Sequence, residues 1–175
     1  MSRPMDRHTV DRLVVEHLPA ALRLAQRLTR DASTAEDLVQ EALCRILDRW
    51  KSYRGEAAFS TWMMQIIVNV DRDRRRRRES HELVQDYCDA GAREPSAEAA
   101  AAELRGAIRS AIDELPDRQR EVALLSLGEG LPAADVAYIL DTTEANVHTS
   151  LHLARKRIAK AVGITYSRPT QNETR

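Results

Sequence analysis

The sequence has few of the residues on which β-sheet cores depend. Its 175 residues include one phenylalanine and six glycines, and aromatic residues make up only 4%. Sandwich and barrel folds need aromatic strands and glycine-rich turns, so this shortage argues against a β sandwich. Alanine, leucine, arginine and glutamate, which are good helix formers, are plentiful instead. We therefore predict an all-α fold.

Cysteine is scarce, and patterns typical of enzymes or metal sites are missing. Cys44 and Cys88 form no Cys-x-x-Cys pair, which predicts neither a disulfide framework nor a zinc site, and Cys44 is expected in the core. His148 and His152 have the spacing of a metal pair but lack an obvious third ligand. No glycine-rich phosphate loop, nucleophile elbow or His-Glu-x-x-His motif occurs. The sequence thus predicts no enzyme, no cofactor and no bound metal.

Long apolar runs are also missing. None reaches the length of a membrane span, and the N-terminus has no apolar stretch like that of a signal peptide. We therefore expect a cytoplasmic protein with no membrane insertion of its own.

The net charge is zero, but the two signs are segregated along the chain. Arg72 and the run Arg74–Arg78 form a basic block. The stretch from Glu79 to about Glu98 is mostly acidic and has little periodicity, which indicates a linker. We predict a helical domain at 8–80, an acidic, flexible linker at 81–100, a second small helical domain at 101–163 and a polar tail at 164–175.

Apolar residues spaced three and four apart predict the helices of the first domain. At Pro19 we expect either a break or the first turn of a new helix. Ser33 and Glu36 form a capping box ahead of the next helix, in which Leu38 begins the apolar face. Ser60 or Thr61 is expected to cap the helix that carries the basic block.

Aromatic residues lie just upstream of the basic block. Tyr53, Phe59 and Trp62 beside arginines suit a surface that stacks bases and follows the backbone of a single strand. The alternative for Phe59 and Trp62 is a packing role, and for the arginines a solvated helix end. Tyr53, in a loop, is the better candidate for touching bases.

A helix-turn-helix candidate lies in the second domain. The segments LPAADVAYIL and TEANVHTSLHLARKRIAKAVG leave room only for a tight turn, with Asp141 where a left-handed backbone is often needed. The second segment has a predicted buried seam at Val147, Leu151, Ala154 and Ile158. Its outward face, which could enter a major groove or simply be solvated, carries His148, Thr149, His152 and Arg155.

Three segments, in order, resemble the extracytoplasmic-function (ECF) sigma factors of bacterial RNA polymerase. AEDLVQEAL and YRGEAAFSTWMMQIIVNVDRDRRRRR resemble their region 2, and LPDRQREVALLSLGEGLPAADVAYILDTTEANVHTSLHLARKRI resembles region 4. The resemblance spans about Leu18 to Val162. It implies a non-catalytic protein that binds core RNA polymerase, directs it to promoter DNA and helps to melt the DNA.

The resemblance also implies residue roles. Core polymerase would be bound through its clamp helices by Asp37, Gln40 and Glu41, and its flap by helices of region 4. The −10 element would be bound by Tyr53, Arg54, Phe59, Trp62, Asn69, Arg72, Arg75 and Arg76. The −35 element would be bound by Thr143, Asn146, His148, Thr149, His152 and Arg155.

The sequence departs from the family at several of these positions. His148, Ser150 and Leu153 stand where basic residues are common, and Val68 stands where an arginine is frequent. Asp141 replaces a usual glycine. These departures reduce the positive charge of the second helix of the helix-turn-helix, so the sequence does not predict which −35 bases it would prefer.

Two alternatives remain open at the level of the sequence. One is a helix-turn-helix regulator that acts without polymerase docking, and the other is a degenerate sigma-like interaction protein. The paired basic and acidic segments also lead us to expect an anti-sigma partner, which could hold the protein at the membrane.

Overall fold

The computed structural model describes residues 6–79, 97–164 and 166, and every element in these ranges is helical. This confirms the predicted all-α fold for the described part of the chain. Predictions on 80–96 and on most of the tail lie outside it. The elements are α1 (Arg7–Thr29), α2 (Ala32–Arg49), a 3-10 turn η1 (Trp50–Ser52), α3 (Phe59–Glu79), α4 (Ala97–Asp113), α5 (Asp117–Ala123), a π turn η2 (Leu124–Gly128), α6 (Ala133–Leu140) and α7 (Glu144–Ala161).

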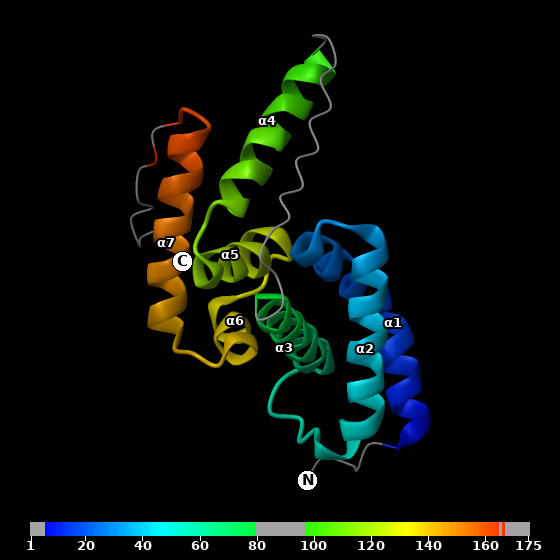
Figure 1. Cartoon of the computed structure of the whole chain (residues 1–175). Helices are drawn as coiled ribbons and strands as arrows, with labels where there is room; N and C mark the ends of the chain where they lie inside the picture. The colour runs from blue at the N-terminus through cyan, green and yellow to red at the C-terminus, as the bar shows by residue number, and fades with distance from the viewer. Residues whose placement is uncertain (1–5, 80–96, 165, 167–175) are drawn as a thin grey trace.

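Helices α1, α2 and α3 pack around a shared apolar core, with α1 and α2 side by side in Figure 1. The faces turned inward are those that the spacing of apolar residues predicted. Their fully buried side chains include Leu24, Leu38, Ile46, Met63 and Ile67.

α1 continues without interruption through Pro19, so the predicted break there is wrong. Proline removes one backbone N–H and tends to bend or break a helix. Pro19 is on the exposed side, however, while Ala21, Leu24 and Ala25 are buried directly after it. Burial of that face keeps this segment helical. The helix ends at Arg30, whose φ of 63° is left-handed.

The N-terminal cap of α2 also differs from the prediction. Asp31, not Ser33, is the capping residue, and its carboxylate accepts a hydrogen bond of 2.7 Å from the backbone N–H of Thr34. Both residue types cap well, but the left-handed Arg30 turns the chain so early that the helix begins ahead of Ser33. Cys44 is exposed on this helix, so its predicted place in the core is wrong.

Helices α4 to α7 form the second group, and α4 begins at Ala97, inside the predicted linker. α6 and α7 make the predicted helix-turn-helix. Asp141 has φ 50° and ψ 64°, as expected of the tight turn, and Thr143 caps α7 by accepting from the backbone N–H of Asn146 at 3.2 Å. Val147 and Ala154 are fully buried on the predicted seam.

The two groups of helices pack directly against each other. α6 lies along α3, and η2 lies against α1. Figure 1 shows α5 and α6 between α3 and α7. One continuous apolar cluster includes Leu24 and Ile67 from the first group and Leu125, Ile139 and Leu140 from the second. The two groups therefore share a core.

Candidate nucleic-acid interface

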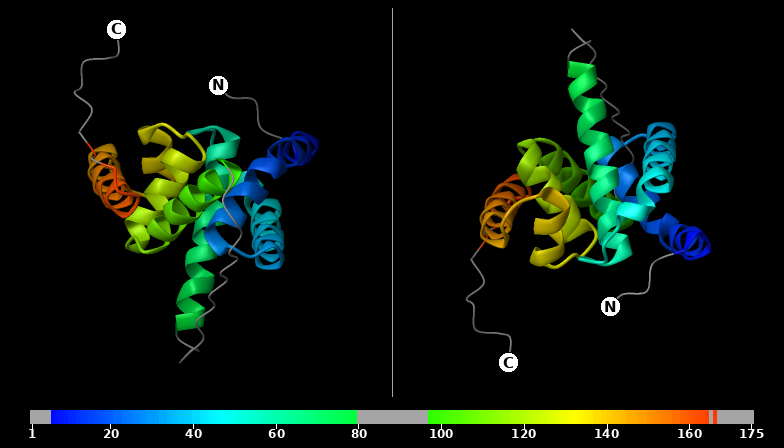
Figure 2. Two further views of the ribbon diagram at one scale, coloured as in Figure 1. Left: turned by 90° about the horizontal axis from the view of Figure 1, so that it is seen from above. Right: turned by 90° about the horizontal axis from the view of Figure 1, so that it is seen from below.

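α3 has an apolar first half and a cationic second half. Met63, Ile67 and Val70, spaced three and four apart, point into the core. The later turns extend beyond the neighbouring helices and project from the body of the molecule (Figure 2). Exposed side chains on this helix belong to Asn69, Arg76, Arg77 and Arg78.

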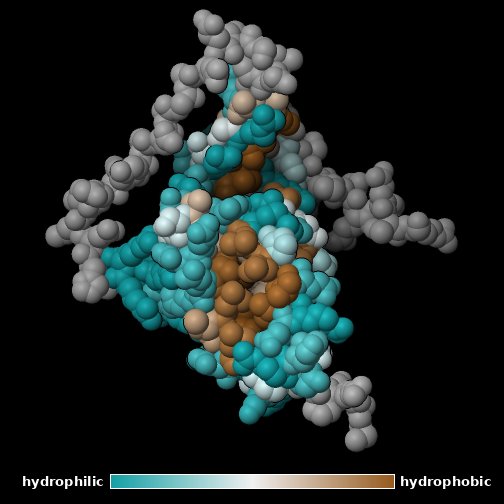
Figure 3. All heavy atoms as spheres, turned by 90° about the vertical axis from the view of Figure 1, so that its right-hand side faces the viewer, coloured by the Kyte–Doolittle hydropathy of each residue, from teal (hydrophilic) through white to brown (hydrophobic). Residues whose placement is uncertain are grey.

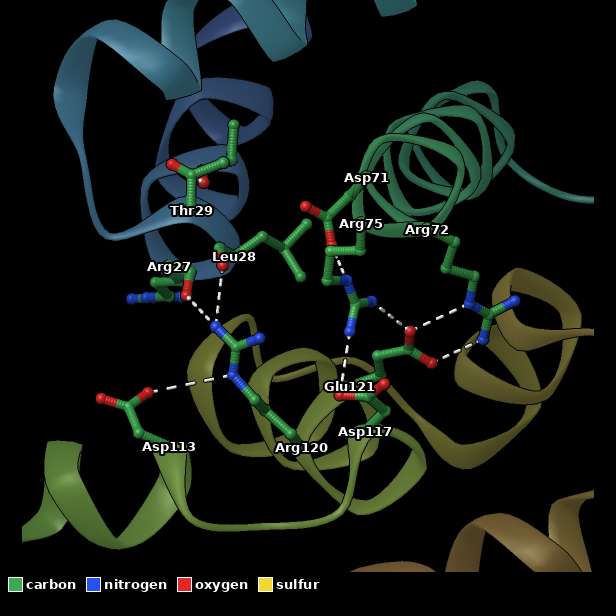
Figure 4. Close-up of polar contacts among 11 residues, drawn as sticks. Arg27, Leu28, Thr29, Asp71, Arg72, Arg75, Asp113, Asp117, Arg120 and Glu121 are labelled. Carbon is green, nitrogen blue, oxygen red and sulfur yellow. Dashed lines mark hydrogen bonds and ion pairs between the residues drawn. The ribbon is translucent and has the colours of Figure 1, made fainter. Parts of the chain in front are cut away.

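Two arginines of the same helix are instead held by carboxylates of α5 (Figure 4). Arg72 binds both oxygens of Glu121 through one edge of its guanidinium group, donating from Nε to Oε1 at 2.9 Å and from Nη2 to Oε2 at 2.5 Å. Arg75 donates from Nη2 to Glu121 Oε1 at 2.9 Å, and its Nη1 lies 3.0 Å from Asp117 Oδ1. Arg75 Nε is also 3.0 Å from Asp71 Oδ2.

Glu121 is the electrostatic centre of these contacts, and its side chain is only 4% exposed. Burial alone would raise the pKa of Glu121, but the hydrogen bonds and positive charge of Arg72 and Arg75 outweigh burial and lower it below its usual value. Burial raises the pKa of Asp71, because Arg75 compensates that carboxylate only in part. Glu121 is thus an ionised carboxylate that occupies two guanidinium groups at once.

Arg120 connects the same short helix to α1. Its Nη2 donates to the carbonyl oxygen of Leu28 at 2.7 Å, within the last turn of α1, where a cation is favourable. Burial, followed by repulsion from Arg30, lowers the pKa of Arg120. Sequence reasoning assigned no role to Arg120 or Glu121. The available signal was their position directly before the apolar run Val122–Leu125, where charged side chains are drawn into an interface.

The loop before α3 forms a hollow of about 200 Å³ lined by Ser52, Tyr53, Arg54, Glu56, Trp62 and Tyr138. The Tyr53 hydroxyl donates to the carbonyl oxygen of Ala57 at 2.6 Å, and the Tyr53 ring contacts those of Phe59 and Trp62. Tyr53 is half-buried, and burial and then Tyr138 raise the pKa of its hydroxyl. Phe59 and Trp62 are buried, which fits their predicted packing role.

The residues predicted to bind polymerase lie on α2. Asp37 and Gln40 are exposed. Glu41 is half-buried and engaged: it accepts from Arg45 at 2.7 Å and from Arg74 Nε at 2.8 Å. The hydrogen bond from Arg74 is the main cause of the lowered pKa of Glu41. Glu41 thus joins α2 to the cationic half of α3.

An apolar surface is visible on the side of the molecule formed by α1 and α2 (Figure 3). Val15 of α1 is 70% exposed. Half-buried apolar residues on these helices include Leu18, Leu22, Leu43 and Leu47. A patch of this kind on a folded chain often marks a binding surface.

The outward face of α7 is open to solvent. Asn146, His148 and Thr149 are exposed, while His152 and Arg155 are half-buried. Thr149 Oγ1 donates to the carbonyl oxygen of Ala145 at 2.9 Å. Basic residues exposed further along the helix are Lys156, Arg157 and Lys160.

The described ranges contain neither a metal-ion site nor a membrane-spanning helix. No group of three or more histidine, cysteine, aspartate or glutamate residues is arranged to hold a metal ion. None of the described helices is both long and apolar enough to cross a membrane.

Comparison with known families and relatives matches both halves of the chain. Residues 13–81 match Sigma-70 region 2, and residues 105–158 match Sigma-70 region 4. The ECF RNA polymerase sigma factor SigM of Mycobacterium tuberculosis is 31% identical over 160 residues, which cover 90% of this chain and 79% of SigM. The RNA polymerase sigma-H factor of Pseudomonas aeruginosa is 27% identical over 169 residues, covering 90% and 88%.

Solved structures share the fold. A chain in the co-crystal structure of the sigma factor RpoE with the anti-sigma factor NepR from Bartonella quintana has a TM-score of 0.69 at 22% identity, covering 89% of this chain and 98% of that chain. The structure of CnrH in complex with the cytosolic domain of CnrY gives a TM-score of 0.66 at 19% identity, with 90% of each chain covered.

Proposed function

Because the chain belongs to the ECF RNA polymerase sigma factors, we propose that it binds core RNA polymerase, directs it to −35 and −10 promoter elements and helps to melt the DNA. The supporting observation is that one chain carries, in family order, a cationic helix beside an aromatic hollow and a helix-turn-helix. A regulator acting without polymerase needs only the helix-turn-helix. The match to region 2 therefore supports the sigma-factor prediction and neither alternative.

Core polymerase would bind the face of α1 and α2. Asp37 and Gln40 are exposed there, and apolar side chains such as Val15 gather on the same side of the molecule. An apolar centre with polar residues around it is the usual make-up of a protein interface. Glu41, being held by Arg45 and Arg74, would act mainly by fixing the position of α3 relative to α2.

The −10 element would bind along the loop and α3. The hollow beside Tyr53 is lined by both polar and aromatic side chains, as capture of an unstacked base requires. Phe59 and Trp62 would hold the ring of Tyr53 in place, and exposed Arg54 would meet the backbone. Further along α3, phosphates would be bound by Asn69, Arg72, Arg75 and Arg76.

The −35 element would be read by α7. A recognition helix places residues of its N-terminal half on base edges in the major groove. Asn146, His148 and Thr149 are exposed in that half, after the cap at Thr143. His152 and Arg155 follow on the same face, and exposed Lys156, Arg157 and Lys160 would add phosphate contacts.

The remaining parts of the proposal follow from the same role. The protein would act without a catalytic centre or cofactor, in the bacterial cytoplasm, where polymerase works. An anti-sigma factor would control it; the sigma factor RpoE, which shares the fold, was crystallised in complex with the anti-sigma factor NepR.

Run-off transcription tests the function directly. Purified bacterial core polymerase is given a library of genomic promoter fragments with and without the protein. Start sites that depend on the protein are expected, and their upstream sequences reveal the −35 and −10 bases. Binding to core without new start sites would favour the degenerate interaction protein, and no binding to core would favour the separate regulator.

A pair of variants separates polymerase docking from DNA binding. The double change Asp37→Ala and Gln40→Ala should abolish transcription and core binding while leaving binding of duplex DNA by α7 unchanged. Glu103→Ala, at an exposed position of α4, is the control and should be fully active. Loss of duplex binding in the double variant would contradict this division of roles.

A further inference from the structure

The second group of helices covers the surface assigned to the −10 element. Glu121 of α5 holds Arg72 and Arg75, two of the arginines assigned to DNA. Tyr138 of α6 lines the hollow beside Tyr53. The contact is reinforced by Gln65 of α3, whose Nε2 donates to the carbonyl oxygen of Tyr138 at 2.9 Å.

These contacts compete with DNA for the same groups. Glu121 holds the Nε–Nη2 edge of Arg72, so a phosphate can bind that edge only after the carboxylate has left. Glu121 therefore occupies the position of a phosphate at Arg72, and Tyr138 places an aromatic ring beside the proposed base site. On the outward face of α7, Asn146 and His148 are exposed, and the described contact there is that of Tyr166 with His152.

We propose that α5 and α6 are an intramolecular competitor of −10 DNA, so that the chain must separate α5 and α6 from α3 before region 2 can bind the −10 strand. The proposal rests on the function proposed above. It adds that the −35 helix is accessible in this closed arrangement, whereas Arg72, Arg75 and the hollow beside Tyr53 are held by α5 and α6. The two promoter contacts are therefore made in order, with region 4 able to bind first.

Several interactions hold the closed arrangement together besides Glu121. Ile139 and Leu140 of α6 belong to the same buried cluster as Ile67 of α3. Arg120 binds the carbonyl oxygen of Leu28, and Arg27 forms an ion pair with Glu129. Separation exposes this apolar surface to water, so the closed arrangement is favoured without DNA. The apparent affinity for the −10 strand is reduced by the small fraction of open molecules.

The test compares Glu121→Gln with the wild-type full chain. The amide keeps the size of the side chain but removes the negative charge that Arg72 and Arg75 bind. Binding of a short fluorescent single-stranded oligonucleotide of mixed sequence is measured by anisotropy over a range of salt concentrations. We expect Glu121→Gln to bind about threefold tighter or more, because the open fraction rises. The salt slope should steepen by up to about 1.4, or about 0.7 for each arginine released.

Glu129→Gln is the matched control. It removes a carboxylate from the same interface, but Glu129 binds Arg27, which has no proposed role in DNA binding. Its salt slope should equal that of the wild type. A second variant, Arg72→Ala, is made in both the wild-type and the Glu121→Gln backgrounds, and it should remove more affinity from Glu121→Gln than from the wild type.

The outcomes separate this proposal from the function on which it rests. If Glu121→Gln binds like the wild type while Arg72→Ala weakens both equally, α5 does not compete, and the DNA role of α3 stands. If Arg72→Ala changes neither background, the arginine assignment itself is wrong, and the competitor proposal fails with it.

Hydrogen exchange tests the same proposal on the wild-type chain, so it does not depend on whether a variant folds. Amide hydrogen exchange in α6 reports on local opening of the interface. Saturating oligonucleotide should speed exchange at Ala137–Leu140 if DNA displaces α6 from α3. Unchanged or slower exchange there, with DNA bound, would overturn the proposal.

Discussion

The cationic half of α3 and the outward face of α7 are both assigned to DNA, yet they differ in how far the rest of the folded chain contacts them. Arg72 and Arg75 on α3 are bound by carboxylates from a segment far away in sequence. Asn146 and His148 on α7 are exposed. The protein thus covers part of the more strongly charged surface, the part that carries Arg72 and Arg75. Positive charge attracts nucleic acid and internal carboxylates by the same physics, so charge density alone does not show which surface is available.

The largest effect on stability should come from Glu121→Ala. It leaves Arg72 and Arg75 without their shared partner, and loss of one member of a buried ion pair costs about 3 kcal/mol or more. His148→Ala on exposed α7 should change the free energy of unfolding by less than about 0.5 kcal/mol. Urea denaturation of both variants tests the contrast. Equal values would mean that the ion pairs contribute nothing to closure.

Tyr53→Ala should weaken binding of single-stranded −10 DNA by about 1–3 kcal/mol, the value expected for one stacked base. Tyr138→Ala removes a ring from the other wall of the same hollow and should not weaken binding, because Tyr138 belongs to the covering helix. Anisotropy with the polymerase complex measures both. If both variants lose affinity equally, Tyr138 is part of the DNA site and does not cover it.

Acid should weaken the closed chain through Glu121. Its pKa in the folded chain is lowered from the usual value of 4.5, so its stabilising contribution is complete above that pH and is lost as the pH falls through the folded value. Asp71 acts in the opposite sense because its folded pKa is raised. The stability difference between wild type and Glu121→Gln should therefore shrink below about pH 4.5, as followed by thermal melting. A difference that is constant with pH would exclude this role.

The smallest effect is expected on α7. Arg155→Ala should reduce the salt slope of binding to −35 duplex DNA by about 0.9, the contribution of one phosphate contact. Arg109→Ala, at an exposed position on α4, serves as the control and should leave the slope unchanged. Titration of duplex at several salt concentrations gives both slopes. If Arg155→Ala has the same salt slope as the wild type, Arg155 does not contact a phosphate.

Local features were read well from the sequence. The turn at Asp141 and the buried seam with Val147 and Ala154 both depend on residues close together in the chain. The inward face of α3 follows from its periodicity in the same way. These features are confirmed because their causes lie within a few residues.

The wrong predictions concern residues whose conformation or burial depends on neighbouring helices. Pro19 lies inside α1 because the buried residues around it keep the segment helical. Asp31 and not Ser33 caps α2, because α1 ends at the left-handed Arg30 and the connection between α1 and α2 is short. Cys44 is exposed although its neighbours are apolar, because α2 packs on one side only. Each outcome depends on contacts that local patterns do not contain.

The sequence by itself determined the helices, the helix-turn-helix and the family, since periodicity, turn chemistry and ordered motifs are properties of short segments. The tertiary structure decided which of the DNA-facing residues are available. Glu121 lies 49 residues from Arg72, and Tyr138 lies 73 residues from Gln65, so no local pattern pairs them. Burial of a shared apolar core brings them together, and only then does a carboxylate occupy the arginines of α3.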